Sequence, residues 1–129
     1  MKKIKKKKLP KISTLRNKLD NEFNTYIRER DGKCILSKDK IKLVCSHYYG
    51  KVARPILRWD ERNAHAMSKK MHWKHHHGHE AEYANWMYNK YGIEYMNLLH
   101  EDSKLKINAT REYLNEMILY YQEKRKRLK

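Results

Sequence analysis

Cysteine is scarce in this chain, and long apolar runs are absent from it. Two cysteines, Cys34 and Cys45, are too few for a disulfide scaffold, which indicates reduced thiols and a protein that works inside a cell. No stretch approaches the roughly 20 apolar residues needed to cross a bilayer. Residues 1–8 are basic, but no apolar segment long enough for a secretory signal follows them. We therefore expect a cytoplasmic protein with no membrane partner.

Acidic side chains are also few, and this shortage points to the kind of partner. They number 15 against 31 Lys and Arg, a formal net charge of +16. Such an excess strongly attracts phosphate, so nucleic acid is the favoured partner. At 129 residues the chain is long enough for one domain. We expect a basic flexible arm at residues 1–12, a single domain at 13–123 and a basic tail at 124–129.

Helical periodicity dominates the hydrophobic pattern and predicts a mostly helical α+β protein. Helices are expected at residues 13–30, 68–77, 80–91 and 93–100, and from about 110 onward. Two short strands, at 33–36 and 41–49, are expected to form a hairpin that ends at His47. One face of the first helix collects its apolar side chains, which are Leu15, Leu19, Phe23, Tyr26 and Ile27.

Two histidines and an asparagine follow one another in the order His47, Asn63, His72. Hydrolysis of a phosphodiester needs a general base near neutral pH and a cation on the scissile phosphate. His47, at the end of a strand, could accept a proton from water, while the Asn63 amide could brace the loop that orients it. His72, on the following helix, could bind a divalent cation, and His76 lies one helical turn further on and could face the same metal.

Each residue taken alone also has a plain structural explanation. A histidine at a strand end is usually a satisfied or surface residue, Asn63 suits a turn, and the histidines between 72 and 79 form a histidine-rich patch. The ordered set favours a nuclease site. His75, His77 and His79 are assigned to solvent or to DNA contact, and His65 remains unassigned. The basic side chains expected to follow the DNA backbone are Lys51, Arg54, Arg58, Lys69 and Lys70.

The stretch from Tyr26 to about Leu99 resembles the phage NinG (Rap) recombination nucleases and neighbouring HNH endonucleases of the His-Me finger class. The resemblance implies a ββα-metal core at about 33–78, with an N-terminal helix before it and helices after it. It also implies His47 as general base, Asn63 as the structural asparagine and His72 as metal ligand. The matching segments are Tyr26-Ile27-Arg28-Glu29-Arg30-Asp31, Ser46-His47-Tyr48, Leu57-Arg58-Trp59-Asp60, Asn63-Ala64-His65-Ala66, His72, and Tyr91-Gly92 with Leu98-Leu99.

The same resemblance implies a double-stranded or branched DNA substrate and one divalent ion, usually Mg²⁺ or Mn²⁺. A phage-encoded protein of this kind would act in the host cytoplasm. Two CxxC pairs that bind a structural zinc are common in the family, but only Cys34-Ile35-Leu36-Ser37 and Ser68-Lys69-Lys70-Met71 stand here. One thiolate cannot complete a four-ligand zinc site, so no structural zinc is expected. Packing of Leu36, Met71 and Trp73 would then join the hairpin to the helix.

Val44 stands near the place where NinG-like sequences have an aspartate. If that carboxylate binds metal in relatives, His76 or a water must substitute here. An imidazole-rich site would favour Mn²⁺, Ni²⁺ or Zn²⁺ over Mg²⁺, which prefers oxygen ligands.

Three functions remain open at this point. The first is an endonuclease that nicks or cleaves DNA as a monomer or a homodimer. The second is a catalytically decayed nuclease scaffold that binds DNA or a phage or host protein. The third is an RNA-binding module whose tyrosines and tryptophans stack on bases, although these residues mostly fall at helical core spacing.

Overall fold

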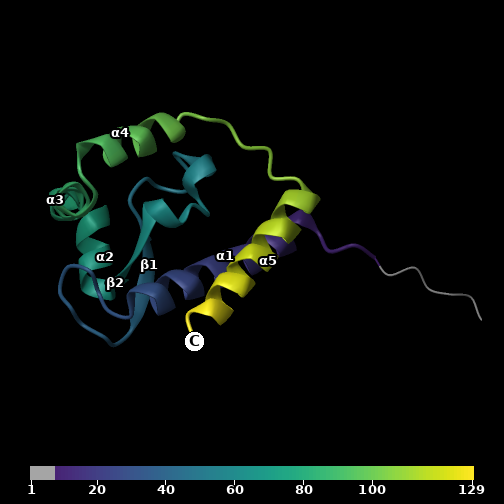
Figure 1. The fold of residues 1–129 in the computed structure, drawn as a ribbon, viewed down its shortest axis with the longest axis horizontal. Helices are drawn as coiled ribbons and strands as arrows, with labels where there is room; N and C mark the ends of the chain where they lie inside the picture. The colour runs from purple at the N-terminus through teal and green to yellow at the C-terminus, as the bar shows by residue number, and fades with distance from the viewer. Residues whose placement is uncertain (1–7) are drawn as a thin grey trace, which may run out of the picture.

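A small antiparallel sheet surrounded by helices makes up the fold (Figure 1), and the expectation of a mostly helical α+β protein is confirmed. The computed structural model describes residues 8–129, so most of the predicted basic arm lies outside the described residues. No helix in that range is both long and apolar enough to span a bilayer. In chain order the elements are α1 (Ile12–Asp31), β1 (Leu43–His47), β2 (Ala64–Ser68), α2 (Lys69–His76), α3 (Glu80–Tyr91), α4 (Ile93–Asp102) and α5 (Arg111–Arg127).

The hairpin consists of β1 and β2, joined by a long loop at residues 48–63. Leu43 pairs with Ser68 at one end of the ladder, and His47 pairs with Ala64 at the other. Since α2 begins directly after β2, its start lies near Leu43, at the end of the ladder opposite to His47, and the helix then packs on both strands. Ser68 caps α2 by accepting a hydrogen bond from the Met71 N–H at 3.3 Å.

The prediction of a strand at 33–36 is wrong. The chain turns there instead, because the Lys38 N–H donates to the Cys34 carbonyl at 2.9 Å and Lys38 has a φ of 68°. Ile35 still donates its N–H to the Ala66 carbonyl at 3.1 Å. The segment therefore lies against the outer edge of β2 but does not extend into a ladder. β1 pairs instead with β2, a strand that the hydrophobic pattern did not predict.

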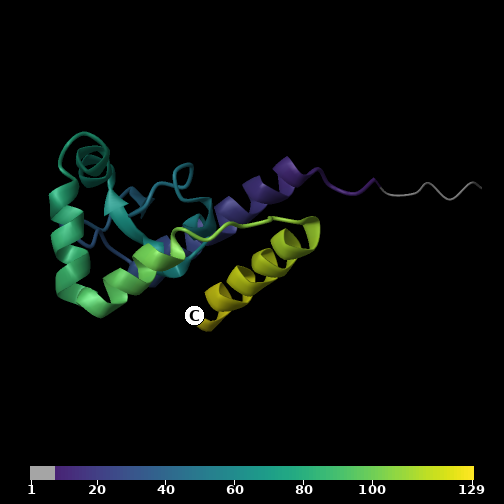
Figure 2. The same cartoon turned by 90° about the horizontal axis from the view of Figure 1, so that it is seen from above.

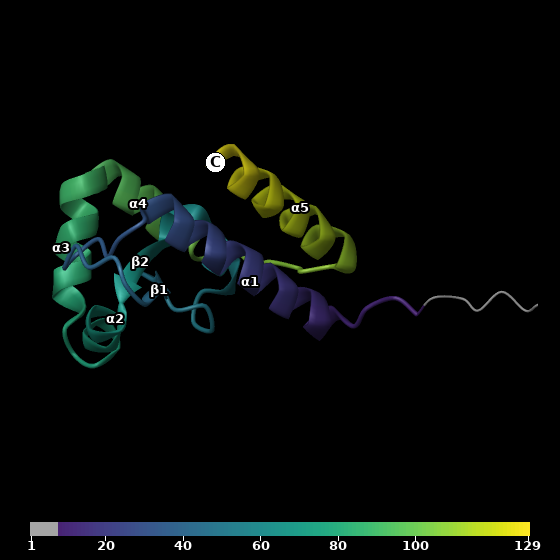
Figure 3. The same cartoon turned by 90° about the horizontal axis from the view of Figure 1, so that it is seen from below.

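Helices α1 and α5 run side by side in the same direction and form one core with the loop (Figures 1 and 3). The five residues predicted for the apolar face of α1 are all buried, and Leu114, Ile118 and Tyr121 of α5 pack against them. Residues 124–127, expected to belong to a basic tail, continue α5. Arg125 explains the difference, because its guanidinium pairs with Glu22 at 2.9 Å and Glu29 at 3.0 Å.

Helices α2, α3 and α4 pack on the hairpin away from α5 and enclose a second core (Figure 2). This core contains Met67 of β2 together with Met87 and Leu99 from α3 and α4. The expected packing of Leu36 and Met71 is confirmed, since both are partly buried against it. Trp73 is the exception, because it is 57% exposed and stacks on His77 with ring centroids 4.2 Å apart.

Candidate active site

A cavity of about 200 Å³ lies between the end of β1, helix α2 and helix α1. The two imidazoles of His47 and His72, predicted to converge from separate elements, both line it. His76 and Lys51 line it as well, so two of the predicted metal and DNA contacts share the same space. The remaining lining residues are Asn24, Cys45 and Gly50.

His47 is held by a backbone carbonyl in a single tautomer. Its Nε2 donates to the Arg58 carbonyl at 2.8 Å, and a carbonyl oxygen only accepts, so Nε2 carries the proton. The neutral ring then has its lone pair on Nδ1. Burial lowers the pKa of His47, and the positive charge of Lys51 lowers it further. The hydrogen bond to the Arg58 carbonyl raises this pKa, but the net shift is downward. A neutral imidazole with a free Nδ1 is the form that can accept a proton.

Asn63 closes the loop between the strands, as its predicted bracing role requires. The side chain is 0% exposed. Its Oδ1 accepts from the Tyr49 N–H at 2.8 Å, and its Nδ2 donates to the carbonyls of Tyr49 and Leu57 at 2.9 and 3.2 Å. Its own carbonyl accepts from the Tyr48 N–H at 2.7 Å. The carboxamide therefore joins the start of the loop to Leu57. The next residue, Arg58, is the one whose carbonyl binds His47.

His72 reaches the hairpin from the first turn of α2. Its Nδ1 is hydrogen-bonded to the Ser46 hydroxyl at 3.0 Å, so Nε2 is the nitrogen left for another ligand. The His72 and His76 rings lie 4.5 Å apart between centroids, as expected for residues one turn apart. Burial, and after it the neighbouring imidazoles, lower the pKa of His72 to about 4. The ring is thus neutral near pH 7, which is the protonation state that a metal ligand needs.

The donor set around the cavity is rich in imidazole and poor in carboxylate. Within residues 8–129, no group of three or more His, Cys, Asp or Glu is placed to hold a metal ion. Burial raises the pKa of the Cys45 thiol to about 12, so it faces the cavity as a neutral group. Val44, which stands near the place where the resemblance implies an aspartate, is not one of the lining residues. Apart from His47, the candidate base, the cavity offers two imidazoles as metal ligands, those of His72 and His76.

Asp20 of α1, which the sequence analysis did not single out, holds the loop that binds His47. Its carboxylate accepts from Arg58 Nε at 3.0 Å and from Trp59 Nε1 at 2.8 Å. Tyr121 of α5 adds a hydrogen bond to the Trp59 carbonyl. Because the Arg58 carbonyl binds His47, these contacts fix the position of the base. No local pattern could reveal Asp20, since its partners lie far along the chain.

His65, which remained unassigned from the sequence, is a buried structural residue. Tyr83 donates its hydroxyl proton to the Ser46 carbonyl at 3.1 Å, so His65 Nδ1 must donate to Tyr83, at 2.8 Å. Tyr91 then donates to His65 Nε2 at 2.7 Å. Burial lowers the pKa of His65 to about 3, which keeps the ring neutral. The network supports Ser46, the partner of His72, from the far face of the hairpin.

His75 was expected to contact solvent or DNA, but its ring packs against tyrosines inside the protein. The ring packs edge-on against Tyr83 at 4.8 Å and lies parallel to Tyr48 at 6.4 Å. Its Nδ1 is buried without a hydrogen-bond partner. This side chain therefore belongs to the packing between α2 and α3.

The five basic residues expected at DNA fall into two groups. Lys51 on the loop and Lys69 and Lys70 in the first turn of α2 are exposed, and Arg54 is half-buried. Arg58 is different because Asp20 takes up its guanidinium, with the shortest contact at 2.5 Å. The exposed lysines thus keep their charge available, whereas the charge of Arg58 is largely neutralised within the fold.

The two segments at which the resemblance implies CxxC pairs, Cys34–Ser37 and the start of α2, come together around Cys34. Burial raises the pKa of the Cys34 thiol, but hydrogen bonds from Ser37 and the backbone of Ser68 outweigh it and leave the pKa below its ordinary value. The Ser37 N–H lies 3.3 Å from Cys34 Sγ. The turn and the start of α2 therefore meet through this one thiol.

Comparison with known proteins places the chain in a family. No curated protein and no solved structure matches it. The family model described as Bacteriophage Lambda NinG protein matches residues 1–129, which is the entire chain. The resemblance carried by the segments around His47, Asn63 and His72 is thereby confirmed for its NinG part, and the chain belongs to the bacteriophage lambda NinG protein family.

Proposed function

We propose that this NinG-family protein is a metal-dependent endonuclease of the HNH type that hydrolyses phosphodiester bonds in DNA. The order β1, β2, α2 corresponds to the ββα core expected for that class. The observation that carries the proposal is a shared cavity, which His47, whose Nδ1 is the unprotonated nitrogen, lines together with the pair His72 and His76. A general base, a metal-binding pair and a cation are what phosphodiester hydrolysis needs together.

In this mechanism His47 takes a proton from water at Nδ1. The oxygen then attacks phosphorus, the ester bond to the leaving oxygen breaks, and a proton from solvent completes the leaving hydroxyl. The Nε2–H remains bonded to the Arg58 carbonyl, whose dipole stabilises the imidazolium. Lys51, at the rim of the same cavity, would pair with a non-bridging oxygen of the phosphate.

His72 and His76 would hold the divalent ion, and the donor set suits an open site. Two protein ligands leave positions for phosphate and water oxygens, as catalytic metal sites require. When bound, the ion would supply neutralising charge to the scissile phosphate. Because imidazole is a better ligand for Mn²⁺, Ni²⁺ and Zn²⁺ than for Mg²⁺, we expect Mn²⁺ to support activity better than Mg²⁺.

Wild-type protein should convert supercoiled plasmid to nicked circles when Mn²⁺, Mg²⁺, Ni²⁺ or Zn²⁺ is present, and EDTA should stop the reaction. One hairpin–helix unit binds one scissile phosphate, so nicked circles should accumulate before linear DNA. A time course on agarose gels measures this. If the protein binds the plasmid but leaves it supercoiled with all four metals, the chain is a DNA-binding protein built on a nuclease scaffold.

His76 offers a test of the metal site. His76→Ala should raise the Mn²⁺ concentration for half-maximal nicking by at least about tenfold, because one of two imidazole ligands is lost. His77→Ala is the matched control, since His77 is exposed and binds the Trp73 carbonyl at 2.6 Å through Nδ1. Metal titrations of the two variants measure the difference. Equal curves for both variants would remove His76 from the metal site.

A further inference from the structure

A second cavity adjoins the candidate active site and shares Lys51 with it. Its volume is about 330 Å³, close to the lower end of cavities that hold small organic ligands. Three separate parts of the chain form it: α1, the loop between the strands, and the connection before α5. The lining residues are Arg16, Lys51, Val52, Pro55, Arg58, Trp59, Ile107 and Ala109, with no carboxylate among those that the structure describes.

Two of the cations in this cavity are free to bind an anion. Arg16 and Lys51 are exposed and make no ion pair with any residue of the described range 8–129. Arg58, in contrast, is paired with Asp20 at 2.5 Å. The cavity therefore carries uncompensated positive charge at its rim, beside the place where the proposed function puts a phosphate.

The remaining walls are apolar and suit a flat aromatic ring. Val52 is 89% exposed although it is branched and apolar, and it directly follows Lys51. Pro55 and Ile107 add further apolar lining. The Arg58 guanidinium lies 4.9 Å from the centre of the Trp59 ring, and both side chains line the cavity. Apolar and guanidinium surfaces are those on which unstacked nucleobases bind.

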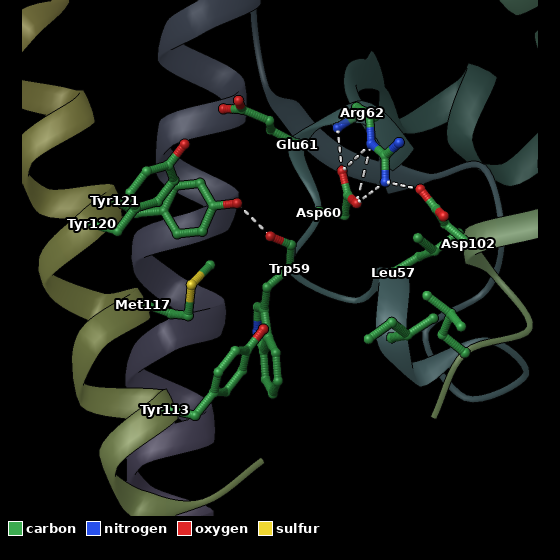
Figure 4. A pocket seen from close by; sticks show the side chains of 12 residues that line it. Leu57, Trp59, Asp60, Glu61, Arg62, Asp102, Tyr113, Met117, Tyr120 and Tyr121 are labelled. Atoms are coloured by element: carbon green, nitrogen blue, oxygen red, sulfur yellow. Dashed lines mark hydrogen bonds and ion pairs between the residues drawn. The ribbon is translucent and has the colours of Figure 1, made fainter. Parts of the chain in front are cut away.

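The larger cavity on the other side of Trp59 has the opposite character. Figure 4 shows acidic side chains from the loop and α4 around it, with tyrosines of α5 opposite. Asp60, Glu61 and Asp102 line it, and Arg62 is held between Asp60 at 2.6 Å and Asp102 at 3.0 Å. Trp59 lines both cavities. Arg62 is engaged by these two aspartates and Lys124 pairs with Glu61 at 3.0 Å, so the cations near this cavity are already taken, whereas Arg16 and Lys51 of the basic cavity are left to bind a phosphate.

We infer that the basic cavity is a subsite for one unpaired nucleotide beside the scissile phosphate. Arg16 and Lys51 bind its phosphate, and Val52 and Ile107 enclose its base. A base stacked and paired in a duplex cannot enter, so the nucleotide must be extruded or already unpaired. The position beside the scissile phosphate rests on the proposed function, whereas binding of the base needs no cleavage.

The test measures binding of full-length protein in EDTA to three fluorescent DNAs. One is a perfect duplex, one carries a single-nucleotide bulge, and one carries the same bulge without its base. The base-containing bulge should bind about tenfold more tightly than the abasic bulge, the gain typical of one enclosed base. Ala109→Phe, which fills the cavity at constant charge, should abolish this ratio. Ala81→Phe on the exposed surface of α3 is the matched control and should keep it.

Val52→Ser tests the same cavity without disturbing the fold, because a side chain that is 89% exposed contributes little to packing. It should lower the ratio of base to abasic affinity at least threefold while the circular dichroism spectrum stays unchanged. Equal affinity of wild type for the two bulges would overturn the subsite, and so would an unchanged ratio in Ala109→Phe. Absence of plasmid nicking would count against the endonuclease alone, since the binding ratio is measured without metal.

Discussion

His47→Ala is expected to lower the rate of plasmid nicking by about a hundredfold to ten-thousandfold, the usual contribution of a general base. The residue is suited to that role by three features: a proton fixed on Nε2 by the Arg58 carbonyl, a pKa lowered by burial, and a position on the wall of the cavity that holds His72. Alanine removes the proton acceptor but leaves the metal-binding pair in place.

The affinity for DNA should change by less than about twofold in this variant, because a neutral imidazole neutralises no phosphate. His79→Ala is the matched control, since that histidine is exposed and lies outside the cavity. The His47 ring lies 5.7 Å from that of Phe23, so thermal unfolding of the variant should be recorded to show that the packing survives. Nicking at the wild-type rate by folded His47→Ala protein would show that another group activates water.

The helices were predictable because their signals are local. In α1 the apolar residues repeat at helical spacing, and the predicted face from Leu15 to Ile27 is the buried one. Gly32, with a φ of 68°, ends the helix close to the predicted place. Such signals need only neighbours within a few residues, and they give the helices to within a turn.

The strand β2 was missed for a physical reason. All five of its residues are buried, so the alternation of apolar and polar side chains that marks a half-exposed strand is absent. Its sequence, Ala-His-Ala-Met-Ser, also lacks branched and aromatic residues other than His65. Burial on both faces, supplied by α1 on one side and by α3 with Tyr83 on the other, holds it as a strand.

The site was partly predictable because chain order limits where side chains can meet. His47, Asn63 and His72 were chosen from their order, and the structure brings His47 and His72 to one cavity and Asn63 to the loop beside it. Asp20 could not be found in this way. It acts through contacts 38 and 39 residues along the chain, and a lone aspartate on a helix has no pattern that points to a distant loop.

Asn63→Ala is expected to destabilise the protein by about 3 kcal/mol, which corresponds to a fall in Tm of roughly 10 °C. The side chain is fully buried, and its removal leaves the Tyr49 N–H and the carbonyls of Tyr49 and Leu57 without their partners. Buried groups without partners cost more than the bonds themselves contributed. Thermal or urea unfolding followed by circular dichroism measures the loss, and Asn97→Ala on the exposed face of α4 should change Tm by little.

The same substitution should lower nicking well below the melting temperature, and this separates orientation from stability. Asn63 binds Leu57, whose neighbour Arg58 offers the carbonyl that holds His47. Loosening the loop therefore releases the base from its tautomer and position, which lowers the rate at each temperature where the protein remains folded. A variant that is less stable yet nicks at the wild-type rate at low temperature would mean that Asp20 and Trp59 alone are enough to position the Arg58 carbonyl.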